Sequence, residues 1–401
     1  MMDSSQLKNL AEKNEVRIDK HREPPYFYDS LRNAYYHYFK TFITKNSSYE
    51  SYIISSTTYN RKQLKALERQ FLDEENTYLT IVLFQRFFEL FLKDLLKKTN
   101  MKLVQSEARG GGLKQSKTTW ELINKIKSGS FSPYKPDGKG VYTIPFNNTI
   151  KRFYDLIDYS KDPIKKSNSI VKKFSITIKN FTFLDNSDYK STFEFLNWYR
   201  DRILHNGNKL PRLRFLDFII TKRVIPITVN IINSDTTITQ GWLFFTKTIT
   251  GIEILQEMMA TDFDVRNLKN DKTIKKTIHN LLYLAHLKEL GRANMNMNNF
   301  VKMNHSTYEY NYRDPIGRGK RFAEVEVKKH PHAKIIISCH CCGNESKVFY
   351  EEQIDDFFNS GKTIKIQWVK CYVCEYHLRY NVGDLSLFND SFEPLFDRDL
   401  Y

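Results

Sequence analysis

The sequence predicts a mainly α-helical chain with a small β-containing region in the middle and a cysteine-containing unit at the end. Three observations predict this class. Residues 60–98 contain no glycine or proline and carry one apolar stripe at helical spacing. Two stretches after residue 207 are rich in isoleucine, valine, threonine and phenylalanine, a composition that favours strands. All five cysteines lie beyond residue 338.

Length and charge limit the class of protein. The chain has 401 residues, enough for two or three domains, and its 41% hydrophobic and 14% aromatic residues exclude a disordered chain. Lysine and arginine total 62 against 46 acidic residues, which gives a net charge of +16. This excess favours a polyanionic partner, either nucleic acid or an anionic membrane surface. The alternative explanation is the amino-acid bias of an AT-rich genome.

The most apolar segment does not predict a membrane-spanning helix. Residues 78–96 are interrupted by five polar or charged side chains, which are Gln85, Arg86, Glu89, Lys93 and Asp94. The first 20 residues lack the apolar centre of a signal peptide. A cytoplasmic location is therefore expected by default.

Helices are expected through the first half of the chain. Aromatic residues at helical spacing follow Pro24-Pro25 and predict a helical lead-in within residues 1–59. Residues 60–98 predict one long helix, or two joined end to end. Thr118 or Thr119 is expected to cap a short helix that Gly129 ends.

The second part of this half has two further predicted helices, over residues 148–160 and 186–207. The lysine-dense stretch 161–180 between them predicts a solvated face or a loop. The predicted helical bundle covers residues 60–215.

A mixed α/β region is expected over residues 216–310. The stretches 214–233 and 236–251 predict strands. Residues 271–291 predict a helix that Gly291 ends, and residues 292–320 predict a linker. The last predicted domain covers residues 311–401.

The cysteines of this last domain form two Cys-x-x-Cys pairs, Cys339/Cys342 and Cys371/Cys374, separated by 28 residues. This is the spacing of a four-thiolate zinc site, and the apolar alternation ahead of each pair predicts the strands of a zinc ribbon. Four thiolates leave no open coordination position, so the zinc is expected to be structural. Cys341 is expected to be a spectator, while His340 or His377 remains an alternative ligand. The module is either a stability element or a docking module for nucleic acid or protein.

The stretch "NWYRDRILHNG", Asn197 to Gly207, combines an arginine and a histidine at the end of a helix. Asp201 and His205 share a helix face, so the carboxylate can hold the imidazole. Arg200 and His205 are five residues apart, an offset of roughly 140°, so they do not share a face within one copy. The negative end of the helix dipole favours a protonated His205. The stretch predicts an anion site for a phosphodiester; the alternative is a surface Arg–Asp pair with a capping histidine.

A second motif lies on the long upstream helix. Glu89 and Lys93 stand at the favourable i, i+4 spacing in an otherwise apolar segment, where unpaired charges would be costly.

Together these motifs resemble those of a HEPN domain (higher eukaryotes and prokaryotes nucleotide-binding) over residues 60–210. The family's Arg, four to six residues, His motif is matched by Arg200, Asp201 and His205. Its Glu-x-x-x-Lys motif on an earlier helix is matched by Glu89 and Lys93. The segment "TTWELINKI" resembles the intervening helix.

This resemblance implies a metal-independent endoribonuclease whose site is formed by two copies of the chain. His205 would act as general acid or base at the ribose 2′-hydroxyl, and Arg200 would stabilise the charge on the phosphate. Asp201 would orient His205 or Arg200, and Glu89 and Lys93 would shape or assist the site. The expected products are a 2′,3′-cyclic phosphate and a 5′-hydroxyl, so RNA and not DNA is the expected substrate.

The biological setting that the resemblance suggests is a toxin or an abortive-infection anti-phage effector, with a regulatory protein or a phage-derived trigger as a further partner. Some HEPN toxins carry a tyrosine two residues after the histidine, which a nucleotidyltransferase modifies. Gly207 occupies that position here, which argues against this form of control. Two other functions stay open. One is a non-catalytic RNA-binding adaptor, and the other is a DNA-binding regulator that acts through the zinc ribbon.

Overall fold

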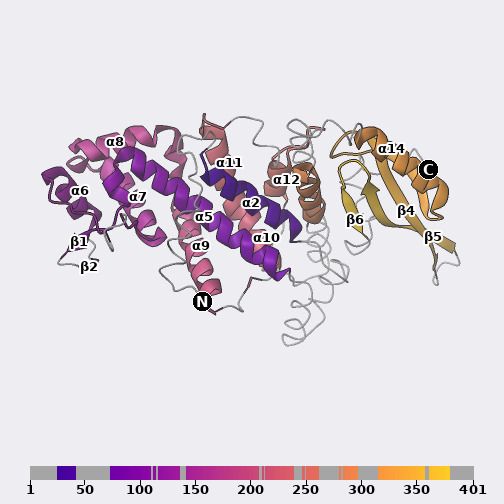
Figure 1. Cartoon of the computed structure of the whole chain (residues 1–401), viewed down its shortest axis with the longest axis horizontal. Coiled ribbons are helices and arrows are strands. Elements are labelled where there is room, and N and C mark those ends of the chain that lie inside the picture. The colour runs from indigo at the N-terminus through magenta and orange to yellow at the C-terminus, as the bar shows by residue number, and fades with distance from the viewer. Residues whose placement is uncertain are drawn as a thin grey trace, which may run out of the picture.

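The computed structural model describes residues 25–41, 73–109, 112–113, 116–135, 141–206, 210–211, 213–238, 246–248, 250–261, 280, 283–296, 315–356 and 361–379. The molecule is elongated, with a helical body at one end and an antiparallel sheet at the other (Figure 1). The chain is mainly helical and its sheet lies near the C-terminal end, which confirms the predicted mainly α-helical class with a cysteine-containing β unit at the end. None of the helices in the described ranges is at once long and apolar enough to cross a bilayer.

The helices have the following bounds: α2 (Phe27–Lys40), α5 (Glu74–Thr99), α6 (Thr119–Ser128), α7 (Phe146–Lys161), α8 (Ser169–Thr177), α9 (Ser187–Asn206), α10 (Leu213–Ile219), α11 (Ile225–Ser234), α12 (Ile254–Ala260), a helix over residues 283–296, and α14 (Pro315–Lys329). Shorter helical turns are η1 (Met101–Val104), η3 (Lys165–Ser167), η4 (Lys179–Leu184) and the π-helical η5 (Ile220–Val224). A short antiparallel hairpin is formed by β1 (Ala108–Arg109) and β2 (Gly112–Leu113).

Local capping signals set several of these bounds. The Asp73 side chain accepts a hydrogen bond from the Asn76 backbone N–H at 3.0 Å and begins α5. Thr118 caps α6 by accepting from the Glu121 N–H, and Gly129 ends it with a φ of +76°. Both ends of α6 were therefore predicted correctly. The predicted helix over residues 60–98 is seen from position 74, because residues 60–72 lie outside the described ranges.

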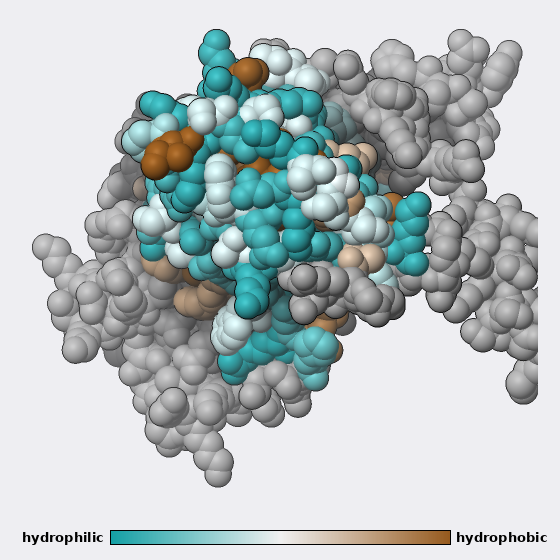
Figure 2. Space-filling model, turned by 90° about the vertical axis from the view of Figure 1, so that its left-hand side faces the viewer, coloured by the Kyte–Doolittle hydropathy of each residue, from teal (hydrophilic) through white to brown (hydrophobic). Residues whose placement is uncertain are grey.

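The lysine-dense stretch 161–180 was predicted as a solvated face or loop, but it folds mainly into η3, α8 and the start of η4. The loop alternative was wrong because Ile170, Val171 and Phe174 lie on one side of α8 and are buried. The lysines occupy the other side. Figure 2 shows that this end of the helical body is mostly covered by hydrophilic side chains.

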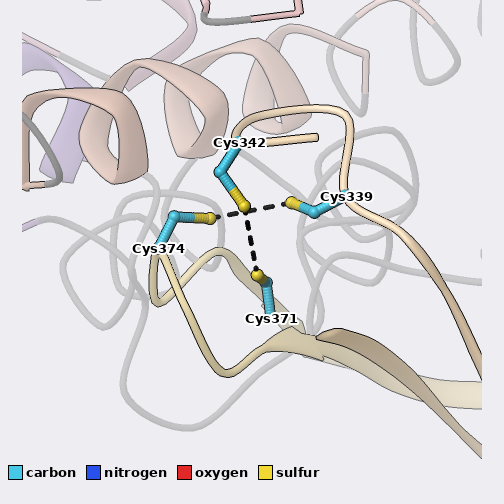
Figure 3. A group of neighbouring side chains, drawn as sticks. All are labelled: Cys339, Cys342, Cys371 and Cys374. Carbon is cyan, nitrogen blue, oxygen red and sulfur yellow. Dashed lines mark hydrogen bonds between the residues drawn. The ribbon is translucent and has the colours of Figure 1, made fainter. Parts of the chain in front are cut away.

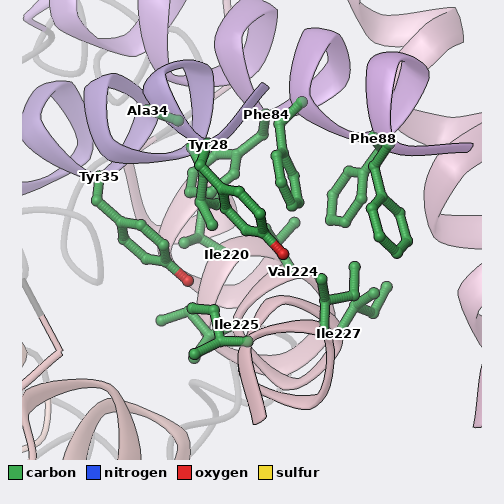
Figure 4. Close-up of a cluster of buried hydrophobic side chains, with 14 of the residues drawn as sticks. Tyr28, Ala34, Tyr35, Phe84, Phe88, Ile220, Val224, Ile225 and Ile227 are labelled. Atoms are coloured by element: carbon green, nitrogen blue, oxygen red, sulfur yellow. The ribbon is translucent and has the colours of Figure 1, made fainter. Parts of the chain in front are cut away.

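The strands predicted over residues 214–233 are helices. Here α10, η5 and α11 run one after another, and their isoleucines and valines enter the core at helical spacing. Side chains that include Ile220, Val224 and Ile227 face aromatic rings of α2 and α5 (Figure 4). Tertiary burial therefore overrides the strand preference of β-branched residues. In the second predicted strand stretch, 236–251, no strand occurs among the residues that the structure describes.

Gly291 does not end its helix, which continues to residue 296. A Cβ atom at this position would lie only 2.4 Å from the Phe39 ring of α2. The glycine therefore serves a close helix approach instead of a helix end. Most of the predicted linker 292–320 lies outside the described residues.

The sheet has the strand order β3 (Ala333–Ser338), β4 (Glu345–Asp356), β5 (Gly361–Cys371) and β6 (His377–Arg379), all antiparallel. The strands expected before each cysteine pair are therefore present. Helix α14 packs on β3 and β4 over a small apolar cluster around Ala323 and Val348 (Figure 1). The cysteines instead belong to the large core that fills the helical body. The predicted borders at residues 59, 215 and 310 stay predictions.

Candidate functional site

A pocket of about 340 Å³ lies between α5, the segment 142–147 and α9. Four of the five predicted catalytic residues line it, namely Glu89, Lys93, Arg200 and Asp201. The fold thus brings together side chains from two helices that are far apart in the sequence.

The α5 wall of the pocket is an ion pair with a second partner. Lys93 Nζ lies 2.6 Å from Glu89 Oε1, and the Gln85 amide donates to Glu89 Oε2 at 2.9 Å. The Lys93 side chain is only 10% exposed. Both oxygens of the Glu89 carboxylate are therefore engaged, and the lysine is held at the pocket wall.

The α9 wall is organised around Asp201. Arg200 Nη1 donates to Asp201 Oδ1 at 2.7 Å, and the Asn197 amide donates to Asp201 Oδ2 at 3.2 Å. The same amide donates to Asn147 Oδ1 at 2.9 Å. Of the two partners predicted for Asp201, the structure shows contact with Arg200.

His205 does not line the pocket. It is exposed in the last turn of α9, and no hydrogen bond to its ring occurs among the described residues. Within one copy of the chain, His205 therefore lies outside the pocket that the other four residues line. The helical offset predicts this relative to Arg200, whereas the expected hold of Asp201 on the imidazole is not formed between these two described residues. Gly207, the predicted helix end, lies outside the described residues.

The sequence motifs did not indicate Gln85, Asn147 or Asn197. Asn197 and Gln85 each stand four residues before a predicted site residue, Asp201 and Glu89, so helical spacing alone could have indicated both. Asn147 reaches the site only through the tertiary fold, and no local signal marks it.

The candidate metal centre is formed by the two cysteine pairs at one end of the sheet (Figure 3). Cys339 Sγ lies 3.6 Å from Cys374 Sγ, and Cys342 Sγ lies 3.7 Å from Cys371 Sγ. All four sulfurs are buried and lie within 4.8 Å of one another. Zn–S bonds of about 2.3 Å place the sulfurs of a regular tetrahedron about 3.8 Å apart. The cluster therefore has the dimensions of a metal site, compatible with structural zinc.

The surroundings of the four sulfurs also fit a metal ion. Lys347 Nζ is buried and has no hydrogen-bond partner among the described residues. Burial lowers the pKa of Lys347 to about 8, while the four cysteines oppose that shift. Four thiolates around Zn²⁺ carry a net double negative charge, which a buried ammonium would compensate.

The remaining candidates near the metal centre have other contacts. The buried Cys341 thiol donates to the Leu290 carbonyl at 3.8 Å, which agrees with its predicted role as a spectator. His340 and His377 are not part of the four-residue group. The His377 backbone N–H donates to Glu289 instead.

No protein-family model, curated protein or solved structure gives a significant match to the chain. Function is therefore inferred from the site itself.

Proposed function

We propose that the chain is a HEPN-type, metal-independent endoribonuclease and that the pocket between α5 and α9 holds the phosphate at which RNA is cut. The observation that supports this proposal is the meeting of the Glu89–Lys93 pair and the Arg200–Asp201 pair in one open pocket. Each of the two motifs is recognisable in the sequence without the other. Two unrelated surface ion pairs would have no reason to lie in the same pocket.

Arg200 and Lys93 supply the positive charge of this proposed site. A guanidinium presents two parallel N–H donors to phosphate oxygens, and an ammonium acts as a point charge beside them. Asp201 fixes Arg200, and Glu89 fixes Lys93. Donors held in place in this way stabilise the charge that develops on the phosphate in the transition state.

His205 is proposed to act across a homodimer. Its exposed position at the end of α9 makes it available to the pocket of a second copy of the chain. There it would take the proton of the ribose 2′-hydroxyl while the 2′-oxygen attacks phosphorus and the bond from phosphorus to the 5′-oxygen breaks. The 5′-oxygen takes its proton from solvent water. The products are a 2′,3′-cyclic phosphate and a 5′-hydroxyl.

The biological role proposed is that of a cytoplasmic toxin or anti-phage effector, controlled by a regulatory protein or a phage-derived trigger. This part of the proposal rests on analogy with the family. The zinc is proposed to be structural, with no part in the cleavage.

A non-catalytic RNA-binding adaptor is the second candidate. The position of His205 outside the pocket of its own copy favours it. An adaptor would need Arg200 and Lys93 for RNA binding and would not need the histidine.

Cleavage of total RNA by the full-length protein tests the proposal. We expect the wild type to cut with free Mg²⁺ chelated and His205→Ala to lose activity by about 10²-fold or more. Lys98→Ala is the control for loss of a charged side chain outside the site, because Lys98 pairs with Asp94 on α5 and does not line the pocket. Circular dichroism and zinc content establish that each variant is folded. If neither protein cuts and both bind RNA equally, the adaptor function replaces the enzyme.

Mixing two inactive variants tests whether the site is shared between copies. In a dimer of Arg200→Ala with His205→Ala, one of the two clefts contains both native residues if arginine and histidine come from different copies. The mixture should then recover part of the activity. If both residues act within one copy, every cleft of the mixed dimer is defective and no activity returns.

A further inference from the structure

The outward face of α9 carries an exposed tryptophan that the proposed cleavage chemistry does not use. Trp198, Arg202 and His205 stand at i, i+4 and i+7, which places them on one side of the helix. Trp198 is 51% exposed, and the Arg202 guanidinium carbon lies 5.1 Å from its ring centroid.

Other aromatic rings hold this tryptophan in place. Phe195 lies 6.1 Å from the Trp198 ring centroid with the ring planes tilted by 40°, and Tyr199 lies 5.5 Å away edge-on. Phe195 in turn packs against Phe215 of α10 at 6.0 Å. The indole is therefore supported from within the protein while much of its surface stays open to solvent. A preorganised aromatic surface of this kind loses little conformational entropy on binding.

The tryptophan face adjoins the pocket through Asp201. Asp201 is three residues from Trp198 and four from His205, so it stands at the edge of their face. It also lines the pocket and binds Arg200. A chain of nucleotides that crosses α9 would meet the indole on one side of this edge and the Arg200 guanidinium on the other.

We propose that Trp198, together with Arg202, stacks on an unpaired base of single-stranded RNA and so positions the adjoining phosphate at the pocket. The inference rests on the proposed function and deepens it, because it names the side chains that hold a base of the substrate beside the pocket. Aromatic side chains stack on any exposed base, and a neighbouring arginine adds a cation–π contribution. A base within a duplex does not offer its face to such a side chain.

Charge favours RNA as the ligand of the Trp198–Arg202 part of this face, which precedes the His205 end that the proposed homodimer uses. The apolar surface is bordered by the Arg202 cation, and the chain carries a net charge of +16. A polyanion is attracted to the Arg202 cation beside the indole.

Binding of a fluorescently labelled 16-nucleotide oligouridine to the full-length protein tests the inference. All variants carry His205→Ala, so that no RNA is cut. Adding Trp198→Ala should raise Kd by about 5- to 150-fold, the range expected for one stacked base. Trp198→Phe should retain most of the affinity because a ring remains. Phe322→Ala is the matched control, since Phe322 is 60% exposed on α14 in the other half of the molecule, and it should bind like the parent.

Abasic nucleotides separate stacking from a structural effect. One abasic nucleotide, moved along the oligouridine, should weaken the parent at one position and leave Trp198→Ala unaffected there. An abasic penalty of the same size in both proteins would show that Trp198 does not stack on that base and would overturn the inference.

Three further outcomes would overturn the stacking role of Trp198. They also show whether the proposed ribonuclease function fails with it. Unchanged affinity of Trp198→Ala, with weakened binding by Arg200→Ala, removes the stacking role and leaves the phosphate pocket. Absence of RNA binding by the parent removes both. A change from dimer to monomer on Trp198→Ala, measured by light scattering, assigns the face to contact between copies.

Discussion

Two groups of charged side chains in this molecule contain the same residue types and differ in their access to water. In the open pocket, Glu89–Lys93 and Arg200–Asp201 face a cavity that a ligand can enter. In the second group, here called the buried joint, Lys288 and Asp217 pair at 2.5 Å with both side chains 1% exposed. Lys288 also donates to Thr41 Oγ1 at 3.0 Å. This pair connects the helix over residues 283–296 to α10 and to the end of α2.

The buried joint continues to the metal centre. Arg292 donates two hydrogen bonds of 2.6 Å to the Glu289 carboxylate. Glu289 also accepts the His377 backbone N–H, and Arg292 donates to the Glu375 carbonyl. Burial raises the pKa of Glu289, while the hydrogen bonds from Arg292 oppose that shift. The turn that carries Cys374 is thus held against the helical body by a carboxylate and a guanidinium.

The two groups differ in the role that each can have, which is structural for the buried joint and ligand binding for the open pocket. Charges that are dry and fully paired fix the relative position of helices, and removing one partner leaves an uncompensated charge. Charges at an open pocket exchange water for ligand at little cost, and their mutual attraction is weak.

Chelation of the zinc proposed at the four cysteines should have the largest effect and should act on the buried joint. Structural zinc contributes apparent free energies of about 10–16 kcal/mol in isolated zinc-finger peptides. We expect a strong chelator to increase hydrogen exchange in residues 283–296 and 345–356, while α5 and α9 stay protected. An equal loss of hydrogen-exchange protection in α5 and α9 would show that the metal site stabilises the pocket as much as the buried joint.

Asp217→Ala should reduce the free energy of unfolding by about 3–5 kcal/mol, because it leaves the Lys288 ammonium buried without its counterion. Urea denaturation measures the change. The double variant Asp217→Leu, Lys288→Met removes both charges and should recover most of the loss. A small effect of the single variant would mean that the pair is hydrated.

Acid should weaken the joint through His286, whose ring bonds to the Tyr376 hydroxyl at 2.7 Å. Burial, with the charges of His340 and Lys347, holds the pKa of His286 well below its usual value. Near pH 6.5 the His286 side chain therefore becomes protonated in the unfolded chain but stays neutral in the folded chain. The free energy of unfolding should consequently fall as pH drops below about 6.5. The slope is about 1.4 kcal/mol per pH unit until the folded-state pKa is reached.

The control for this titration is His286→Gln, which keeps a hydrogen-bonding side chain and should flatten the slope. His340, whose pKa burial lowers to about 4, should leave a residual slope of the same sign. An unchanged slope in His286→Gln would exclude His286 as the source.

Gly291→Ala should destabilise the chain by about 1–3 kcal/mol, although alanine is the better helix former, because the added Cβ meets the Phe39 ring. Thermal unfolding measures the change. In a Phe39→Leu background, Gly291→Ala should cause a smaller loss of stability. A stabilised single variant would show that the α2 contact is not tight.

Changes in the open pocket should have the smallest effect on stability. Glu89→Gln should reduce the free energy of unfolding by less than the loss of about 3–5 kcal/mol expected for the buried joint, because the pair lines an open pocket. Its counterpart Lys93→Ala should reduce the salt dependence of RNA binding by about 0.7 in the log–log slope, the value for one phosphate contact with a single strand. Lys98→Ala should leave that slope unchanged. A large loss of stability in Glu89→Gln would place this pair with the buried joint.

Sequence reasoning succeeded where neighbours along the chain carry the information. Short-range spacing predicts four features of the structure. These are the Glu89–Lys93 pair, the separation of Arg200 from His205, the cap at Thr118 and the group of four cysteines. It failed where burial decides. Residues 214–233 have the composition of strands and form helices because their apolar residues fill the core beneath α2 and α5.

The same limit applies to individual positions. Gly291 has the form of a helix end, and only the approach of Phe39 explains its place inside a helix. Asn147 belongs to the pocket through a contact with Asn197 from a different helix. The buried Lys288 could not be predicted at all, because its counterion lies 71 positions away.

The hydrogen bond from Lys288 to Thr41 spans 247 positions of the chain. Helix α2 therefore cannot complete its contacts during synthesis until the chain has grown past residue 288. At about 5–20 residues per second, the delay between the two positions is roughly 12–50 s. During that interval the aromatic face of α2 lacks part of its final cover, so chaperones that bind nascent chains have a defined segment and a defined period in which to act.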